Sequence, residues 1–380
     1  MFRKGTAILC YFRQSCEAKH VPEKNENNFN LIRVCAAVFV ILAHSFALLK
    51  KDDPLTKIAN SEGFGSLGVC IFFVISGYLI TKSFMNSSTK FSFIRSRILR
   101  ICPALSVVVL LAVFVLGPCL TKLSIGEYFT NPRTWSYLQN IFLTKLQFDL
   151  PGLFSDNPFP HSVNGSLWTL PIEVFCYLLT FLAGCLFFFK RRVFLLLSFL
   201  GLLLFEWTVM SKDELGSQSF LWLGALSSVI KFAVYYFAGT VIYLFRDKLK
   251  LNNWISLIFV AILIGSAKTP YFQFIECLVL PYLVIWLAFQ RNPLVLKYNL
   301  LGDYSYGLYI FAFPIQQTIW HFLRHVNVTQ YFLLSFILTL PAAILSWKLV
   351  ENPFLALKKR KRDLSNVVPA VQAEMVASTK

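Results

Sequence analysis

The sequence predicts an all-α polytopic membrane protein with about ten transmembrane helices and with both termini in the cytoplasm. Three observations support this fold class: an apolar composition, a series of apolar segments long enough to span a membrane, and an uneven distribution of Lys and Arg between the loops. Hydrophobic residues make up 56% of the 380 residues and charged residues only 14%, whereas soluble domains carry about 25% charged residues. A soluble fold could not bury this much apolar surface, but lipid contacts it without penalty.

The apolar segments are each close to the ~20 residues that a helix needs to cross the hydrocarbon core. They lie at about 30–49, 66–85, 103–121, 166–189, 193–210, 220–245, 252–268, 272–290, 300–323 and 331–350. The longest loop between them, residues 122–165, is rich in Pro and Asn turns, and loops of this length are often functional. Its apolar stretch at residues 135–148 is too short to span twice, so we expect it at the membrane interface.

The basic residues set the expected orientation. With the N-terminus placed inside, 23 Lys and Arg residues fall in segments on the inner side and nine in segments on the outer side, which is the positive-inside pattern. We expect residues 1–25 to form a cytoplasmic tail, residues 26–357 to form the transmembrane domain, and residues 358–380 to form a basic, disordered cytoplasmic tail.

The net charge of +17 favours contact with membrane lipids and with an anionic cosubstrate. It does not indicate nucleic-acid binding, because the basic residues lie between apolar spans rather than on one soluble face. None of the nine Cys residues forms a metal-type CxxC pair, so we expect free thiols and no metal.

The first apolar segment carries two ionisable residues, Arg33 and His44. Ionisable groups inside a span are costly and usually indicate function. Their eleven-residue separation places both on one helix face, with a rise of roughly 16 Å between them. The alternatives are an interfacial anchor for the arginine and a hydrogen-bonded packing role for the histidine.

A cluster of arginines, Arg95, Arg97 and Arg100, precedes Pro103 at the start of the third apolar segment. Ordinary positive-inside charge is one explanation. The other is a phosphate clamp, because the planar guanidinium group matches the oxygens of phosphate. Arg97 and Arg100 are three residues apart and would face one way on a helix.

The fourth apolar segment contains Glu173, which we expect in the outer half of the membrane at a depth similar to that of His44. A carboxylate opposite a histidine would orient the ring and stabilise its protonated form, although a purely structural carboxyl group is the alternative. In the second segment, small residues favour close helix packing rather than a serine nucleophile; they are Gly65, Gly68, Ser76 and Gly77.

Six segments, taken in their order along residues 26–357, resemble the membrane acyltransferase 3 family. These are bacterial transmembrane acyltransferases that modify cell-surface and secreted glycans. The matching segments are NLIRVCAAVFVILAHS, FFVISGYLI, RSRILRICPAL, SLWTLPIEVFCY, LGDYSYGLYIFAFPIQQ and SWKLVENPF. The resemblance implies an enzyme that takes an acyl group, most often acetyl, from cytoplasmic acyl-CoA and transfers it to an acceptor hydroxyl.

The resemblance also implies roles for single residues. Arg33 and His44 match the arginine and the histidine of the family's first span. Arg97 and Arg100 match its cytoplasmic arginine pair, and Glu173 matches its carboxylate after a WSL-type segment. The sequence departs from the family pattern at three positions, where the family commonly has Asp, Asp and His: Asn30, Cys70 and Ala312.

Together, the residues and the resemblance predict an O-acetyltransferase of the bacterial inner membrane. His44, supported by Glu173, would deprotonate a hydroxyl of O-antigen, of another exopolysaccharide or of a lipid-linked oligosaccharide. The phosphates of acetyl-CoA would be bound at the inner face by Arg33, Arg95, Arg97 and Arg100. The main alternative is a transporter or flippase of a glycan or lipid precursor, and a sensor or scaffold without catalysis is the second.

Overall fold

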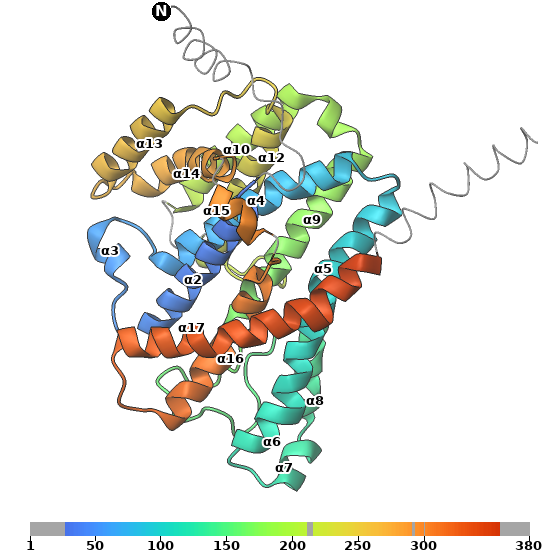
Figure 1. The fold of residues 1–380 in the computed structure, drawn as a ribbon, viewed down its shortest axis with the longest axis vertical. Coiled ribbons are helices and arrows are strands. Elements are labelled where there is room, and N and C mark those ends of the chain that lie inside the picture. The colour runs from blue at the N-terminus through green and yellow to red at the C-terminus, as the bar shows by residue number, and fades with distance from the viewer. Residues whose placement is uncertain (1–26, 211–215, 291–292, 300, 358–380) are drawn as a thin grey trace, which may run out of the picture.

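The computed structural model describes residues 27–210, 216–290, 293–299 and 301–357, so both predicted tails lie outside the described residues. This part of the chain consists of helices joined by loops and forms no strands (Figure 1). The long helices are α2 (Phe29–Leu48), α4 (Phe64–Met85), α5 (Lys90–Leu111), α9 (Leu170–Cys185), α10 (Arg192–Met210), α12 (Leu226–Leu244), α13 (Asn253–Ser266), α14 (Phe272–Ala288), α16 (Ser305–Phe322) and α17 (Val328–Leu345). The short helices are α3 (Pro54–Ile58), α6 (Gly117–Leu120), α7 (Ile125–Thr130), α8 (Pro132–Ser136) and α15 (Pro293–Tyr298).

Each predicted apolar segment overlaps one of the long helices. Six helical segments of the described chain are long and apolar enough to cross a membrane, and α13 and α14 are shorter apolar helices. Two spans are extended by a π-helical turn: α5 continues through residues 112–116 into α6, and α17 continues through residues 346–351. The predicted all-α, multi-pass class is confirmed, while the count of ten spans and the orientation stay predictions.

Helix α4 lies at the centre of the bundle, packed against α2 and α12. Its glycines permit this packing. A side chain at Gly68 would collide with the backbone carbonyl of Ala36 on α2, and one at Gly77 would collide with the carbonyl of Tyr236 on α12. The prediction that small residues in this segment serve close helix packing is confirmed at these two positions.

Segments predicted on the same side of the membrane meet in the structure. The backbone N–H of Asn28, just before α2, donates to the carbonyl of Ala288 at the end of α14 (2.8 Å). At the other end of the bundle, the N–H of Asn60 donates to the carbonyl of Ala267 after α13 (2.6 Å). These contacts fit the alternation of loops that the charge distribution predicts.

The long outer loop, residues 122–164, is ordered and fastened to α16. The side chain of Asn157 donates to the side-chain oxygen of Gln317 (2.8 Å), and the Gln317 amide donates to the carbonyls of Phe159 and Ser162. The side chain of Asn164 donates to the carbonyl of Ile310, in the first third of α16 (2.9 Å). The loop therefore dips into the bundle before α9 begins.

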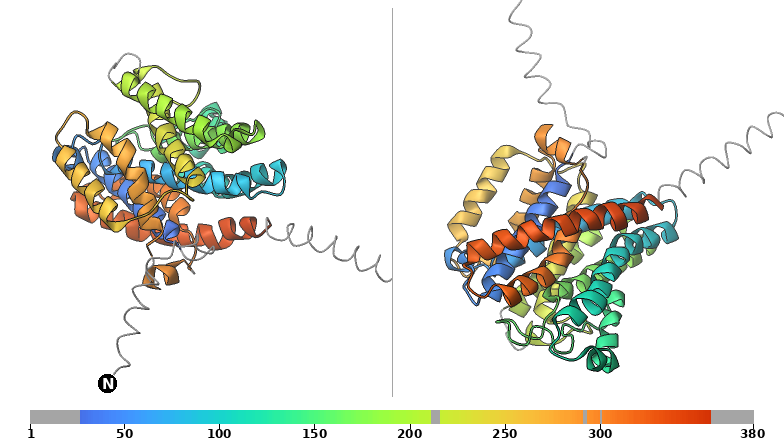
Figure 2. Two further views of the ribbon diagram at one scale, coloured as in Figure 1. Left: turned by 90° about the horizontal axis from the view of Figure 1, so that it is seen from above. Right: turned by 60° about the horizontal axis from the view of Figure 1, so that its bottom comes forward.

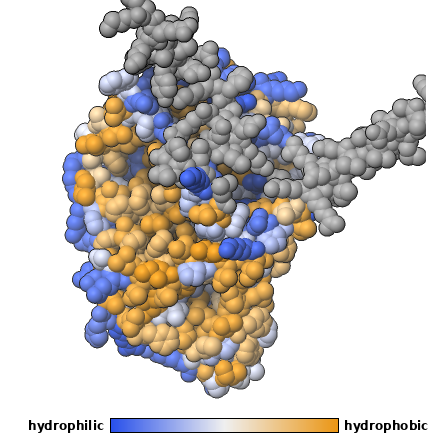
Figure 3. All heavy atoms as spheres, viewed as in Figure 1, coloured by the Kyte–Doolittle hydropathy of each residue, from blue (hydrophilic) through white to orange (hydrophobic). Residues whose placement is uncertain are grey.

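The outer surface of the bundle suits a lipid environment. Figure 3 shows hydrophobic side chains spread over a broad area of the face that carries α17, with hydrophilic atoms along its edges. Helix α17 packs on α16 and α2, and Figure 2 shows it lying across the bundle. Large apolar side chains are exposed on its other face and on the turn after it: Leu333, Ile337, Leu338, Leu345 and Leu349.

Candidate active site

An inner cavity of about 770 Å³ lies where the N-terminal ends of α2 and α5 meet the segment before α16. All four predicted arginines line it. Among its lining residues Asp303 is the one acidic side chain, whereas five side chains are basic: Arg33, Lys82, Arg95, Arg97 and Arg100. The structure thus brings the first-span arginine together with the arginines of α5, and the cavity carries a positive excess that suits an anion.

Two of these arginines are held by carboxylates. Asp303 Oδ2 lies 2.6 Å from Arg33 Nη1 and 2.7 Å from Arg100 Nη2, and Arg100 Nη1 lies 3.1 Å from Glu351 Oε2. The Ser305 hydroxyl also donates to Asp303 Oδ1 (2.5 Å). The carboxylates fix the two guanidinium groups in place.

Sequence reasoning missed Asp303 and Glu351. Both lie within segments that carry the family resemblance, LGDYSYGLYIFAFPIQQ and SWKLVENPF. A carboxylate at the end of an apolar segment needs a charged or hydrogen-bonding partner. This rule could have predicted an ion pair between these carboxylates and the arginines of α5.

Arg97 differs from Arg100 because no carboxylate of the described chain pairs with it. Its guanidinium group donates to the hydroxyl of Ser96 (3.2 Å) and lies over the rings of Phe93 and Tyr177, 5.8 and 5.9 Å from their centroids. Arg95 lines the same cavity and is partly exposed. These two arginines therefore keep more of their charge available to a ligand than Arg33 and Arg100 do.

Glu173 is held by two hydroxyl groups. Its carboxylate accepts hydrogen bonds from Ser76 (2.9 Å) and from Tyr177 (2.5 Å), and it lines a middle cavity of about 50 Å³ together with Arg33. Within the described residues no hydrogen bond joins Glu173 to His44, and the two side chains line different cavities, so the support of His44 by Glu173 stays a prediction. The loop before α9 dips into the bundle, where Asn164 contacts Ile310 of α16.

His44 lines an outer cavity of about 320 Å³. Its ring meets that of Phe313 edge to face, with centroids 5.0 Å apart. Two neighbouring buried atoms, His44 Nδ1 and Gln316 Oε1, each lack a hydrogen-bond partner within the described residues. The amide nitrogen of Gln316 is fixed by the carbonyl of Ile41 and by Ser45, at 3.0 Å each.

The structure shows what surrounds each of the three positions that depart from the family pattern. Ala312 is buried in a small apolar cluster with Ile41 of α2, so no second histidine stands there. Asn30 lines the inner cavity, and Cys70 is buried beside Lys231 on α12. Lys231 is a further residue that sequence reasoning missed, although a lysine inside an apolar segment was a visible signal.

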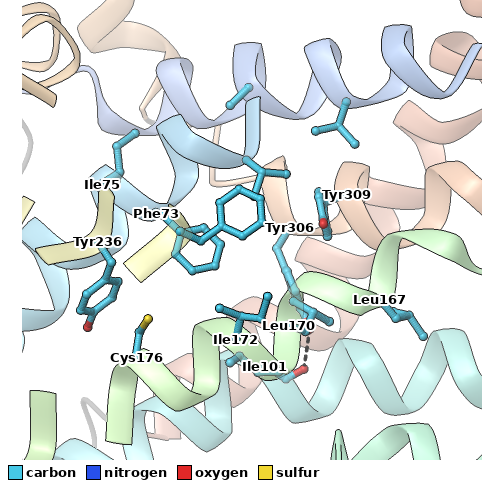
Figure 4. Packing of buried hydrophobic residues seen from close by; sticks show 14 of the residues in the cluster. Phe73, Ile75, Ile101, Leu167, Leu170, Ile172, Cys176, Tyr236, Tyr306 and Tyr309 are labelled. Atoms are coloured by element: carbon cyan, nitrogen blue, oxygen red, sulfur yellow. Dashed lines mark hydrogen bonds between the residues drawn. The ribbon is translucent and has the colours of Figure 1, made fainter. Parts of the chain in front are cut away.

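The three cavities form a series through the bundle. Arg33, Ser76 and Tyr177 line both the inner and the middle cavities, and Val69 and Tyr309 line both the middle and the outer cavities. Figure 4 shows apolar side chains around the middle cavity converging from four helices, among them Phe73, Ile101, Leu170, Tyr306 and Tyr309. The Tyr306 hydroxyl donates to the carbonyl of Ile101 (3.0 Å) and fastens this wall.

The described chain is a multi-pass helical bundle with an arginine-lined cavity at one end and a histidine-lined cavity at the other, as expected for the predicted membrane acyltransferase. The chain matches the acyltransferase domain family over residues 26–348, and it belongs to this family, the acyltransferase 3 family. The predicted recognition is confirmed.

Two known proteins are similar to this chain over most of its length. An O-acetyl transferase of Shigella phage Sf6 is 32% identical over 346 residues, which cover 89% of this chain and 98% of that protein. Nodulation protein 10 of Rhizobium leguminosarum bv. viciae is 27% identical over 364 residues, which cover 88% and 94%. No solved structure matches the chain. The family and the first relative confirm the predicted enzyme class, an O-acetyltransferase.

Proposed function

We propose that this enzyme transfers an acetyl group from cytoplasmic acetyl-CoA to a hydroxyl of a cell-surface glycan, such as O-antigen or another exopolysaccharide, from within the bacterial inner membrane. The observation that carries the proposal is the series of three cavities with shared lining residues, because it offers one route from the arginines to His44.

The inner cavity suits the phosphates of acetyl-CoA. Four arginines line it, and within the described part of the chain carboxylates hold two of them, Arg33 and Arg100. We assign first contact with phosphate to Arg97 and Arg95. Arg33 and Arg100, fixed by Asp303, supply a positive field without needing to reorganise when the anion arrives. A CoA body held here stays on the cytoplasmic side.

We place the pantetheine arm at the middle cavity, which has to widen to admit it, because a volume of about 50 Å³ is smaller than the arm. The wall of the cavity is mainly aromatic and aliphatic, and Glu173 is the acidic group on it. We assign Glu173 to the arm, whose amide N–H groups are donors that a carboxylate accepts well. The Ser76 and Tyr177 hydroxyls hold the carboxylate in one orientation for that contact. This role differs from orienting His44, for which the contacts give no support.

The outer cavity suits the transfer itself. We propose that His44 Nε2 takes the proton of the acceptor hydroxyl while the hydroxyl oxygen attacks the thioester carbonyl. The C–S bond then breaks, and the leaving thiolate takes the proton from His44, so that protons balance over the cycle. Gln316 Oε1 would accept from Nδ1–H and stabilise the charged ring, because its amide nitrogen is already fixed.

The experiment uses sealed membrane vesicles of both orientations, supplied with radiolabelled acetyl-CoA on the outside and de-O-acetylated host polysaccharide on the opposite side. Transfer is expected only when acetyl-CoA meets the cytoplasmic face. Labelling of the polysaccharide that is independent of orientation would contradict the route. Movement of unmodified glycan without acetylation would favour the transporter alternative.

A further inference from the structure

An ion pair lies at the outer cavity and has no part in the reaction described so far. The side chain of Lys231, on α12, is 7% exposed and donates to Ser66 Oγ at 2.7 Å; its Nζ lies 2.8 Å from Oε2 of Glu62, whose side chain is 44% exposed in the loop before α4. Taking an ammonium group out of water is costly. A buried lysine on a membrane helix that is paired with an accessible carboxylate therefore indicates function.

The surroundings of the pair suit a hydroxylated ring. Both members line the outer cavity, and so do His44 and Trp168. Trp168 is 36% exposed, and its indole rests against Phe232, with centroids 5.7 Å apart, so its face offers a flat apolar surface. Serine hydroxyl groups add polar positions to the lining, those of Ser66, Ser227 and Ser228. The volume of about 320 Å³ falls within the usual range of ligand sites.

We propose that Glu62 and Lys231 form the acceptor-sugar subsite of this enzyme, and that the sugar they select is uncharged and carries neighbouring hydroxyl groups. The inference rests on the proposed function, because it assumes that the glycan reaches His44 through the outer cavity. It assigns to this pair the choice of acceptor, whereas His44 performs the chemistry.

The unused hydrogen-bonding groups of Glu62 and Lys231 support a sugar with neighbouring hydroxyl groups as the ligand. The contacts of Lys231 use two of the three donors of its ammonium group, and within the described residues Glu62 Oε1 has no partner. A sugar hydroxyl both donates and accepts, so adjacent hydroxyls match a carboxylate oxygen beside an ammonium group. Hydrogen bonds to charged groups are stronger than those between neutral groups.

The charge of the pair supports an uncharged sugar. Glu62 and Lys231 lie 2.8 Å apart, so the pair itself offers no net charge to an acidic or a basic ring. A uronic acid could not approach Lys231 without bringing its carboxylate close to Glu62, and an amino sugar could not approach Glu62 without bringing its ammonium close to Lys231. Like charges placed side by side in a binding site are unfavourable.

The test uses the full chain in lipid nanodiscs, with acetyl-CoA and de-O-acetylated host polysaccharide as substrates. Lys231→Met and Glu62→Gln are expected to lower kcat/KM for the polysaccharide by about 10- to 100-fold and to leave the affinity for acetyl-CoA unchanged. The matched control is the outer ion pair Lys57–Asp52, whose side chains are 68% and 75% exposed and do not line the cavity. Lys57→Met and Asp52→Asn should change neither quantity.

A charge-swapped variant separates recognition from structure. Glu62→Lys combined with Lys231→Glu keeps an ion pair but inverts the donor and the acceptor, so polysaccharide acetylation should stay low while acetyl-CoA still binds. Full recovery would overturn the proposal, because pairing alone would then suffice. A parallel loss of acetyl-CoA affinity in the single variants would overturn it as well.

Mass spectrometry of the product tests the class of sugar. Acetyl groups on neutral residues are expected, and acetyl groups confined to uronic or other acidic residues would overturn the selection of an uncharged ring. Absence of any transfer by the unmodified enzyme is a different result, which would refute the proposed function itself.

Discussion

Replacing Arg100 and replacing Arg97 should have different consequences, although the two residues are neighbours on one face of α5. Arg100→Ala leaves Asp303 and Glu351 without a shared partner, and these carboxylate side chains are only 9% and 1% exposed. Removing one member of a buried ion pair typically costs about 3–5 kcal/mol, so we expect a loss of stability near the lower end of this range, because Arg33 still pairs with Asp303.

Arg97→Ala should instead leave stability nearly unchanged and weaken donor binding. Arg97 has only serine and ring contacts within the described chain, so its removal strands no carboxylate. A charge-assisted contact with phosphate contributes about 1.5–3 kcal/mol, which corresponds to roughly a 10- to 100-fold rise in the Kd for acetyl-CoA. Arg97→Lys should recover part of this loss, since a point charge does not reproduce the planar fork.

The assay pairs thermal unfolding of the detergent-solubilised protein with titration of acetyl-CoA. As a control, Arg100→Ala combined with Glu351→Gln should regain part of the lost stability, because the unpaired buried charge is removed. If Arg97→Ala binds acetyl-CoA as tightly as the wild type, the phosphate site must lie elsewhere. If Arg100→Ala melts like the wild type, the argument from the buried carboxylates is refuted.

The remaining predictions concern single groups. Asp303→Asn should lower the melting temperature, because Arg33 then loses its carboxylate partner and Arg100 keeps only Glu351 among the described residues; an unchanged melting temperature would contradict this. His44→Ala should abolish acetyl transfer while acetyl-CoA still binds, and near wild-type transfer in membranes would exclude it as the base. Glu173→Gln should raise the KM for acetyl-CoA more than the KM for the acceptor, with the protein level measured alongside. A larger rise in the KM for the acceptor would show that Glu173 acts on the acceptor rather than on the pantetheine arm.

The helices were predictable because an apolar run of about 20 residues has few alternatives in a membrane. The clustering of Arg33 with Arg97 and Arg100 was predictable from the family resemblance, and the structure brings all three to one cavity. Their partners were not, because ion pairs between residues 200 and more positions apart depend on helix packing that periodicity does not encode. The pairing of Arg100 with Asp303 and Glu351 is of this kind.

The surroundings of Glu173 could not be predicted from the apolar pattern. Counting residues from the end of an apolar segment assumes that the segment starts at the membrane surface. Here the preceding loop enters the bundle, where Asn164 reaches Ile310 and Gly165 meets the ring of Phe313. Hydropathy reports which residues avoid water, but it does not distinguish a surface turn from a turn that other helices bury.

The small volume of the middle cavity bears on whether protons and ions could leak across the membrane through the enzyme. A volume of about 50 Å³ holds only a few water molecules, and the hydrogen-bonded residues Ser76, Glu173 and Tyr177 line it. Such a constriction hinders a continuous water wire, so protons and ions would not leak along the proposed acyl route. On the proposed route, the thioester bond alone would drive acetylation on the far side, without drawing on the membrane potential, and the spent CoA would stay where it is recharged.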